Sequence, residues 1–319
     1  MGEVYRDVGE EPVRLEMREG NEFKGICQAI VVNAKRGKHL AVPYGPVTKA
    51  ESGKWKVESD ALIGTLKKIA VENNCSFIRL SPFWPSDNSP KIEGAVPSPL
   101  HLLAEHIWYL DLKGASEESI FKNMRATHRN LIRRSEREGV EVIASNDPLN
   151  DINEFFRLYD ETRKRHHFVP YPSELILSQV KRFSERNECT LYLAKYQGEV
   201  IASSVHMHFG GETSYHHGAS SDKYPKIPAS YALQWKAIKD ALKRSDRMFN
   251  FWGISPPSAN ATGSKPEGAI KHPFAGVRTF KTGFGGELLE LTHCRDIPIS
   301  KKYYVTRAIE TVRKWRRGF

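Results

Sequence analysis

A pattern of expected β-strands occurs twice in this chain of 319 residues, and it constrains the fold more than any other feature. In the first half, three strands are expected over residues 13–17, 25–32 and 39–44. In the second half, three more are expected over residues 190–196, 200–209 and 213–217. Both segments are rich in β-branched and aromatic residues and are broken by glycine, so each predicts a three-stranded meander.

The elements that follow each meander also come in the same order. A helical pattern appears at residues 60–72 and 229–243, and then a short apolar strand at residues 77–80 and 248–254. Three pairs of glycines each differ by 173 positions: Gly25 and Gly198, Gly37 and Gly210, Gly45 and Gly218. Any two meanders share part of this pattern, but three ordered matches favour two copies of one α/β unit.

Helices and one long loop are expected around the second copy. A basic helix covers residues 116–139, and another helix covers residues 151–167. Residues 255–275 are rich in proline, serine and glycine and predict a loop. The chain closes with a basic helix over residues 301–317, whose apolar positions on one side are Val305, Ile309, Val312 and Trp315.

Charge and composition narrow the class of protein. The net charge of +10 favours a polyanionic partner, such as nucleic acid, an anionic membrane surface or a phosphorylated substrate. A basic enzyme without such a partner fits equally well. There is no apolar run of about 18 residues that would predict a membrane-spanning helix. The four cysteines have no CxxC spacing, so reduced cytoplasmic thiols are expected rather than a zinc site or disulfides.

Six stretches of the chain, taken in order, resemble one known family. They are residues 42–47 (VPYGPV), 124–139, 162–166, 215–220, 249–254 and 276–286, which includes FKTGFGG. The chain is similar to the FemABX family of peptidoglycan aminoacyltransferases, in a FemX-like form without a coiled-coil insertion. The resemblance implies an α/β (α+β) fold of two tandem GNAT-like domains with mixed sheets flanked by helices. Domain 1, on the acceptor side, would comprise residues 1–112 and 296–319, and domain 2, on the aminoacyl-tRNA side, residues 113–295.

The resemblance implies a reaction as well. Such enzymes transfer an amino acid from aminoacyl-tRNA to an amine of a peptidoglycan precursor stem peptide, either UDP-MurNAc-pentapeptide or lipid II. The ester is already activated and no Walker-type loop is present, so no cofactor is expected. Adjacent histidines in an extended strand point to opposite faces, so no metal site is expected. We expect a cytoplasmic monomer; the basic termini favour peripheral contact with the inner membrane surface, although no amphipathic anchor stands out.

The expected catalytic residues are Lys281 and Phe280, in the FKTGFGG stretch. Lys281 matches the family lysine that is assigned to the tRNA end and to the oxyanion of the tetrahedral intermediate. The flanking glycines would let the backbone approach a bulky substrate closely. The alternative for Lys281 is a solvated lysine in a turn.

The residues expected to contact the acceptor are Arg165, Tyr215, His217, Arg6 and Ser81. The resemblance assigns Arg165 to the diphosphate, which a guanidinium binds well. Tyr215 and His217 are two apart on a strand and are therefore expected on one face. Ser81 replaces an acidic residue that has been considered as a base, which leaves the proton acceptor open. Because the chain begins inside the family's first helix, either its true start lies upstream or Tyr5 and Arg6 must compensate.

Basic residues of the expected 116–139 helix are candidates for contact with the tRNA backbone. The candidates are Lys122, Arg125, Arg129 and Arg133. The alternative is a solvated helix face that binds nothing.

Three other functions stay open. An acetyl-CoA-dependent acyltransferase would need an [RQ]-x-x-G-x-[GA] loop, but Phe280 stands where Arg or Gln should precede Gly283-Phe284-Gly285. An RNA-binding module without catalysis would bind charged and uncharged tRNA equally. A transferase with the same donor could also use another amine as its acceptor.

Overall fold

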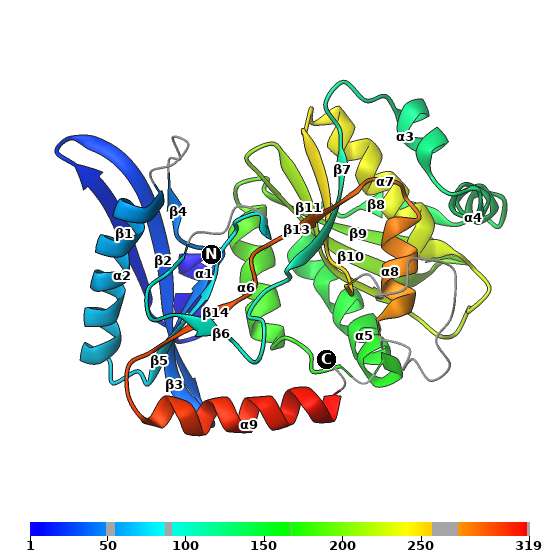
Figure 1. Cartoon of the computed structure of the whole chain (residues 1–319). Coiled ribbons are helices and arrows are strands. Elements are labelled where there is room, and N and C mark those ends of the chain that lie inside the picture. Colours follow the sequence, from blue (N-terminus) through cyan, green and yellow to red (C-terminus); the bar gives the residue numbers. More distant parts are fainter. Residues whose placement is uncertain (49–54, 87–90, 167, 257–273, 318–319) are drawn as a thin grey trace, which may run out of the picture.

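The computed structural model describes residues 1–48, 55–86, 91–166, 168–256 and 274–317. Within them, two seven-stranded sheets stand beside each other, and helices flank both (Figure 1). Each sheet contains one copy of the expected meander. The α/β fold class with mixed sheets is therefore confirmed.

The first sheet begins with an antiparallel meander and continues through a parallel strand. The meander consists of β1 (Pro12–Glu19), β2 (Glu22–Ala34) and β3 (Gly37–Pro43), and the two-residue strand β4 (Val47–Thr48) pairs with β2. After helix α2 (Trp55–Glu72), strand β5 (Phe77–Ser81) lies parallel to β3. Strands β14 (Arg295–Pro298) and β6 (Val96–Pro97) complete the sheet. The end of the chain thus returns to the first sheet.

The second sheet repeats this plan and adds strands at both edges. Its meander consists of β9 (Cys189–Tyr196), β10 (Glu199–Phe209) and β11 (Glu212–Ser220). Helix α7 (Ala229–Lys243) then leads to β12 (Met248–Gly253), which is parallel to β11. Strand β8 (Glu141–Ala144) lies at one edge, and β7 (His106–Asp111) and β13 (Glu287–Glu290) lie at the other.

The duplication is confirmed, but the glycine register used to detect it is wrong. The β1–β2 turn lies at residues 20–21 and the β9–β10 turn at residues 197–198, an offset of 177 rather than 173. Gly25 lies inside β2 and pairs with Met17, so it is not the counterpart of Gly198. At the offset of 177, Gly198 corresponds to Asn21, and the positive φ of Gly20 (58°) corresponds to that of Gln197 (51°).

The expected basic helix is two helices. Helices α3 (Glu117–Asn123) and α4 (Ala126–Arg137) are separated by Met124 and Arg125, which both have extended backbones. Met124 is buried in the core, and the Arg125 N–H donates to the Gly283 carbonyl at 2.9 Å. Tertiary contacts therefore break a helix that its local sequence favours.

The remaining helices set the two faces of the second sheet. Helices α5 (Pro148–His166) and α6 (Ser173–Ser184) cover one face, whereas α4 and α7 cover the other. Helix α1 (Gly2–Asp7) packs on α6, and α9 (Lys302–Arg317) packs on the first sheet (Figure 1). Helix α8 (Ala275–Thr282) follows the expected 255–275 loop, most of which lies outside the described residues.

The strand β7 bears on the expected domain boundary at residue 112. It precedes that boundary in the chain, yet it pairs with β12 and β13 of the second sheet. The division at residue 112 therefore runs after the first strand of the second sheet rather than before it.

Candidate active site

The candidate site is a cavity of about 410 Å³ between β11 and β12. The two strands pair only through residues 212–214 and 248–250, and beyond these residues they are no longer hydrogen-bonded. Tyr215 and His216 of β11, Trp252 of β12, and Phe280 and Lys281 of α8 line the space. A buried parallel pair that separates part-way leaves room for a ligand at the carboxyl end of the sheet.

Lys281 lies in the last turn of α8 and is only 8% exposed. Its Nζ donates to the Gly253 carbonyl at 2.8 Å and lies 5.6 Å from the centroid of the Tyr215 ring. Within the described part of the chain, no carboxylate forms an ion pair with it. Burial lowers the pKa of Lys281 to about 7, because an ammonium loses hydration in such a place. Lys281 is thus a buried helix residue, and the alternative of a solvated turn lysine is wrong.

The glycines after Lys281 serve the packing of the protein itself. A Cβ on Gly283 would overlap the imidazole of His128, and one on Gly286 would overlap the Tyr109 carbonyl. Gly286 also has a φ of 96°, in the region that favours glycine. Our expectation that glycines here admit a substrate is therefore not needed to explain them: Gly283 lets the end of α8 pack against α4, and Gly286 lets the chain after α8 pass close to β7.

Phe280 belongs to an aromatic cluster behind the cavity. Its ring meets Tyr231 at 5.0 Å and Phe284 at 5.4 Å between centroids, and its carbonyl oxygen lies 2.9 Å from His128 Nε2. These edge-to-face contacts stabilise the last turn of α8. Phe280 therefore supports the position of Lys281 as well as lining the cavity.

Arg165, from the last turn of α5, reaches the same cavity. Its guanidinium donates to the Ser220 carbonyl at 3.2 Å and to Ser220 Oγ at 3.0 Å, and it forms an ion pair with Asp222. The planar group is thereby fixed at the mouth of the site next to a carboxylate.

Tyr215 and His217 lie on opposite faces of the sheet, so the expectation of one face is wrong. The register explains this: Val205 pairs with His217 and His206 with Tyr215, so His216 is the extra residue of a β-bulge. Tyr215 stacks on His206 at 5.3 Å and faces the cavity. His217 faces α5 and α6, where its Nε2 lies 3.3 Å from Gln179 Oε1, and burial lowers its pKa.

Two residues that the sequence reasoning did not single out also line the cavity: His216, the bulge residue of β11, and Trp252 of β12. Their rings lie 5.6 Å apart, edge to face. Trp252 has a φ of 65°, and its N–H donates to Asn250 Oδ1 at 2.7 Å. A strained backbone of this kind occurs at functional sites. Trp252 falls in the 249–254 stretch that carried the family resemblance, which was the available signal.

Ser81 and Arg6 are not brought to the cavity. Ser81 ends β5 in the first sheet, where it is 2% exposed and pairs with Pro43. Arg6 lies on α1 and forms ion pairs with Glu3 at 2.7 Å and Glu11 at 3.2 Å. Neither residue lines the Lys281 cavity.

The four basic candidates on α3 and α4 differ in their contacts. Lys122 and Arg125 are exposed. Arg129 donates to the Lys122 carbonyl at 2.9 Å and to the Met124 carbonyl, so it closes the junction between the helices. Arg133 lies 5.2 Å over the Phe121 ring. Two of the four therefore have a structural role of their own.

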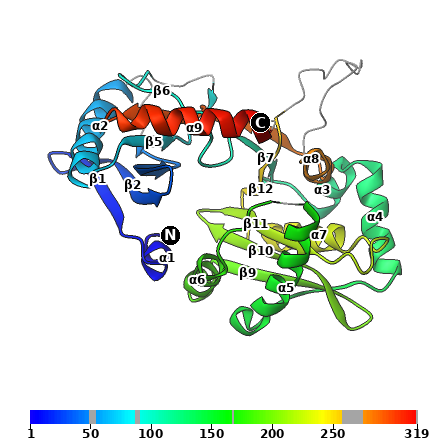
Figure 2. The same ribbon diagram turned by 90° about the horizontal axis from the view of Figure 1, so that it is seen from below.

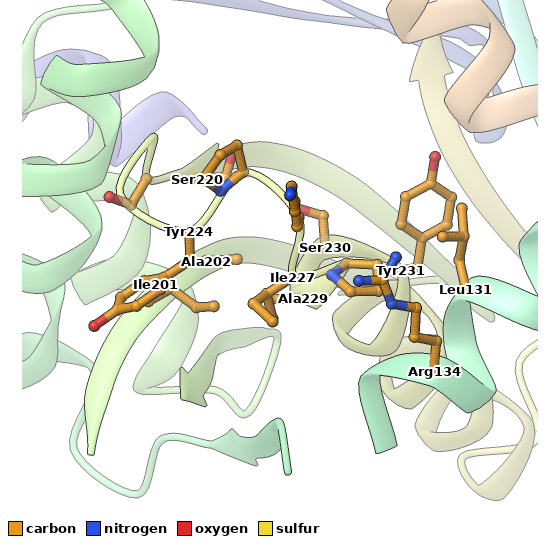
Figure 3. A pocket seen from close by; sticks show the side chains of 14 residues that line it. Leu131, Arg134, Ile201, Ala202, Ser220, Tyr224, Ile227, Ala229, Ser230 and Tyr231 are labelled. Atoms are coloured by element: carbon orange, nitrogen blue, oxygen red, sulfur yellow. The ribbon is translucent and has the colours of Figure 1, made fainter. Parts of the chain in front are cut away.

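A second cavity of about 400 Å³ lies next to the first, at the start of α7 (Figure 3). Ser220 and Ser230 line both cavities. Leu131 and Arg134 from α4 stand at one end of it, beside Tyr231. The basic helix and the Lys281 cavity are thus connected by one continuous surface.

The described residues offer neither a metal site nor a membrane-spanning helix. They contain no group of three or more His, Cys, Asp or Glu side chains placed to hold a metal ion. Nor do they include a helix long and apolar enough to cross a bilayer.

A comparison with protein families decides the identity. The FemAB family model matches residues 103–170 and 174–311, well over half of the chain. The chain belongs to the FemAB family. Every residue named above as lining the Lys281 cavity lies in the matched region, whereas Ser81 and Arg6 lie outside it.

Individual relatives agree with this assignment. The aminoacyltransferase FemA of Staphylococcus epidermidis is 33% identical over 104 residues, which span 32% of this FemAB-family chain and 22% of the relative. The crystal structure of FemX covers 97% of the chain and 92% of its own, with a TM-score of 0.77 and 14% identity. A tandem GNAT protein from the clavulanic acid pathway covers 91% and 84%, with a TM-score of 0.53 and 9% identity. These likenesses confirm the tandem GNAT-like fold.

Proposed function

We propose that this FemAB-family protein transfers an amino acid from aminoacyl-tRNA to an amine of a peptidoglycan precursor stem peptide, on UDP-MurNAc-pentapeptide or lipid II. The observation that carries the proposal is the buried Lys281, which shares one cavity with Arg165 and Tyr215. The family assignment supplies the class of reaction. Because charged tRNA is a cytoplasmic substrate, the reaction belongs in the cytoplasm.

In the proposed reaction, the acceptor amine bonds to the ester carbonyl carbon, and the carbonyl oxygen takes up the negative charge. Lys281 in its neutral form accepts the proton that the attacking nitrogen loses. The resulting ammonium stabilises the oxyanion in a site of low polarity. The bond to the ribose oxygen then breaks, and Lys281 returns the proton to that oxygen. A pKa of about 7 suits both directions of this transfer.

Arg165 is the proposed ligand for the acceptor's phosphate. The Asp222 carboxylate that now pairs with it has the same sign of charge as a diphosphate. A diphosphate can therefore replace Asp222 while Ser220 keeps the guanidinium in place. Tyr215 and Trp252 provide flat surfaces for the stem peptide between this point and Lys281.

The cavity at the start of α7 is the proposed place for the 3′ end of the tRNA. Arg134 and Lys226 line it, and the exposed Lys122 and Arg125 continue the positive charge along α3 and α4. The segment before α7 contains Pro225 and Pro228, which have no N–H to donate. This composition argues against the backbone cradle with which acetyl-CoA-dependent enzymes hold pyrophosphate.

The test follows a labelled amino acid from charged tRNA to UDP-MurNAc-pentapeptide and to lipid II. Lys281→Met should abolish transfer, and Lys68→Met, the same change at an exposed lysine of α2, should leave it intact. Full transfer by Lys281→Met would refute the assignment of Lys281. Donor hydrolysis with every stem-peptide acceptor inert would instead indicate a different amine, and low-micromolar binding of acetyl-CoA would favour the acetyltransferase alternative.

A further inference from the structure

Helix α9 turns its polar side inward. Its buried residues are Tyr303, Thr306 and Glu310. Glu310 forms ion pairs with Arg79 and Arg36, both at 2.6 Å, beneath the helix. Thr306 Oγ1 donates to the Arg36 carbonyl at 2.5 Å. The helix is thus attached to the first sheet by charges and hydrogen bonds rather than by an apolar stripe.

The outward side of α9 is apolar, which is the reverse of an ordinary surface helix. Trp315 is 82% exposed, Val305 64% and Tyr304 61%, and Val312 and Ile309 are also exposed. These are the positions that fall on one side of the helix in the sequence. In Figure 2, seen from below, α9 crosses the face of the molecule that is turned toward the viewer. The stripe therefore faces outward along the length of the helix.

The charges around the stripe have one sign. Residues 301–317 contain seven Lys or Arg residues and a single acid, Glu310, which is buried. By helical geometry, Lys302 and Arg313 lie along one edge of the apolar stripe, and Lys301 and Arg316 lie near its ends. The surface thus offers apolar and aromatic side chains beside several cations, and the one acid of the helix is buried.

We propose that the exposed face of α9 binds the surface of an anionic lipid bilayer. An interfacial helix buries its apolar side chains at the level of the headgroups while Lys and Arg contact the phosphates. Tyr304 and Trp315 suit that depth, because their rings have both apolar and polar parts. A second copy of the chain is a poorer occupant, since two such cationic faces repel each other.

Binding of this kind would orient the whole molecule. With 16 residues, α9 is about 24 Å long at 1.5 Å per residue. Because the Arg79 pair holds the helix rigidly on the first sheet, the bilayer would meet the molecule along this one edge. The inference goes beyond the proposed function and does not depend on it, because binding needs neither tRNA nor an acceptor.

The test is cosedimentation of the full chain with vesicles of phosphatidylcholine alone and of phosphatidylcholine with phosphatidylglycerol in equal parts. We expect binding to the anionic vesicles only, weakened by salt. The double variant Ile309→Gln, Trp315→Gln should bind about tenfold more weakly, equivalent to about 1.4 kcal/mol. The control Phe209→Gln removes a side chain that is 77% exposed on β10 and should bind like wild type.

Three results would overturn the inference. One is a wild-type chain that does not bind anionic vesicles, and another is a double variant that binds as well as wild type. The third is a concentration-dependent dimer, measured by light scattering, that the double variant abolishes, because the face would then belong to a second copy. Both substituted residues are exposed, so thermal unfolding of the double variant should match that of wild type. If the wild-type chain binds anionic vesicles but transfers no amino acid to a soluble acceptor, only the proposed function fails.

Discussion

Replacing Lys281 with methionine should make the protein more stable at neutral pH while it removes the proposed activity. Methionine keeps the length of the side chain and needs no hydration. Lys281 is 8% exposed and has no ion pair within the described residues, so its ammonium is poorly solvated in the folded state. If the hydrogen bond from Lys281 to the Gly253 carbonyl outweighed this cost, the same change would instead destabilise the protein.

The magnitude follows from the pKa of Lys281. Burial lowers that pKa from 10.5 to about 7, and a shift of this size costs about 4 kcal/mol of folding free energy at pH 7. Methionine cannot make the hydrogen bond to Gly253 or the cation–π contact with the Tyr215 ring, which together stabilise the wild-type protein by about 2 kcal/mol. The net gain of about 2 kcal/mol should raise the Tm by about 4 °C.

The pH dependence separates this cause from better packing. Because the folded pKa is the lower one, the unfolded chain binds more protons between about pH 7 and 10.5. The stability of the wild type therefore rises with pH in this window and is lost as pH falls toward 7. The advantage of Lys281→Met should shrink by about 2 kcal/mol between pH 7 and pH 9.

Urea unfolding of wild type, Lys281→Met and Lys68→Met at both pH values measures these differences. Lys68 is exposed on α2, so its variant should differ little from wild type at either pH. A Lys281→Met protein that is less stable at pH 7, or whose advantage is the same at pH 7 and pH 9, would refute the reasoning.

Other predictions concern the packing around the site and the basic helices. Gly283→Ala should lower the free energy of unfolding by about 2 kcal/mol, because the Cβ of the new alanine would overlap the His128 ring. The loss should be smaller in a His128→Ala background, which a double-mutant cycle of urea unfolding measures. Asp296→Asn should lower the free energy of unfolding by about 3 kcal/mol in the same measurement, because the buried Arg79 guanidinium loses one of the carboxylates that neutralise its charge. Lys122→Ala should weaken tRNA binding and lower the slope of log K against log salt by about 0.7 to 0.9 in filter-binding titrations.

The sequence pattern could predict the order of elements but not their register. Hydrophobic and turn composition located both meanders, the helix after each and the parallel strand that follows. The register depends on bulges, and a bulge at His216 inverts the face of every residue beyond it. That is why Tyr215 and His217, two apart in sequence, contact different cores.

Long-range contacts decided the other differences. The break at Met124 arises because Arg125 hydrogen-bonds to Gly283, which is more than 150 positions away, and no local propensity signals such a partner. Helix α9 shows the same limit. Its apolar stripe was visible in the sequence, but the buried charges of Arg79 and Asp296 reverse which side faces the sheet.

The position of Ser81 bears on which group accepts the proton of the attacking amine in the proposed reaction. Ser81 is buried in the first sheet and does not line the cavity, so a carboxylate restored there would also have to reach the site. Lys281 already lies in the cavity, and burial brings its pKa close to neutral. The same desolvation that costs folding energy thus gives one side chain the capacity to take a proton from the amine and to return it. An enzyme organised in this way needs no separate base, and its activity should rise with pH as Lys281 loses its proton around pH 7.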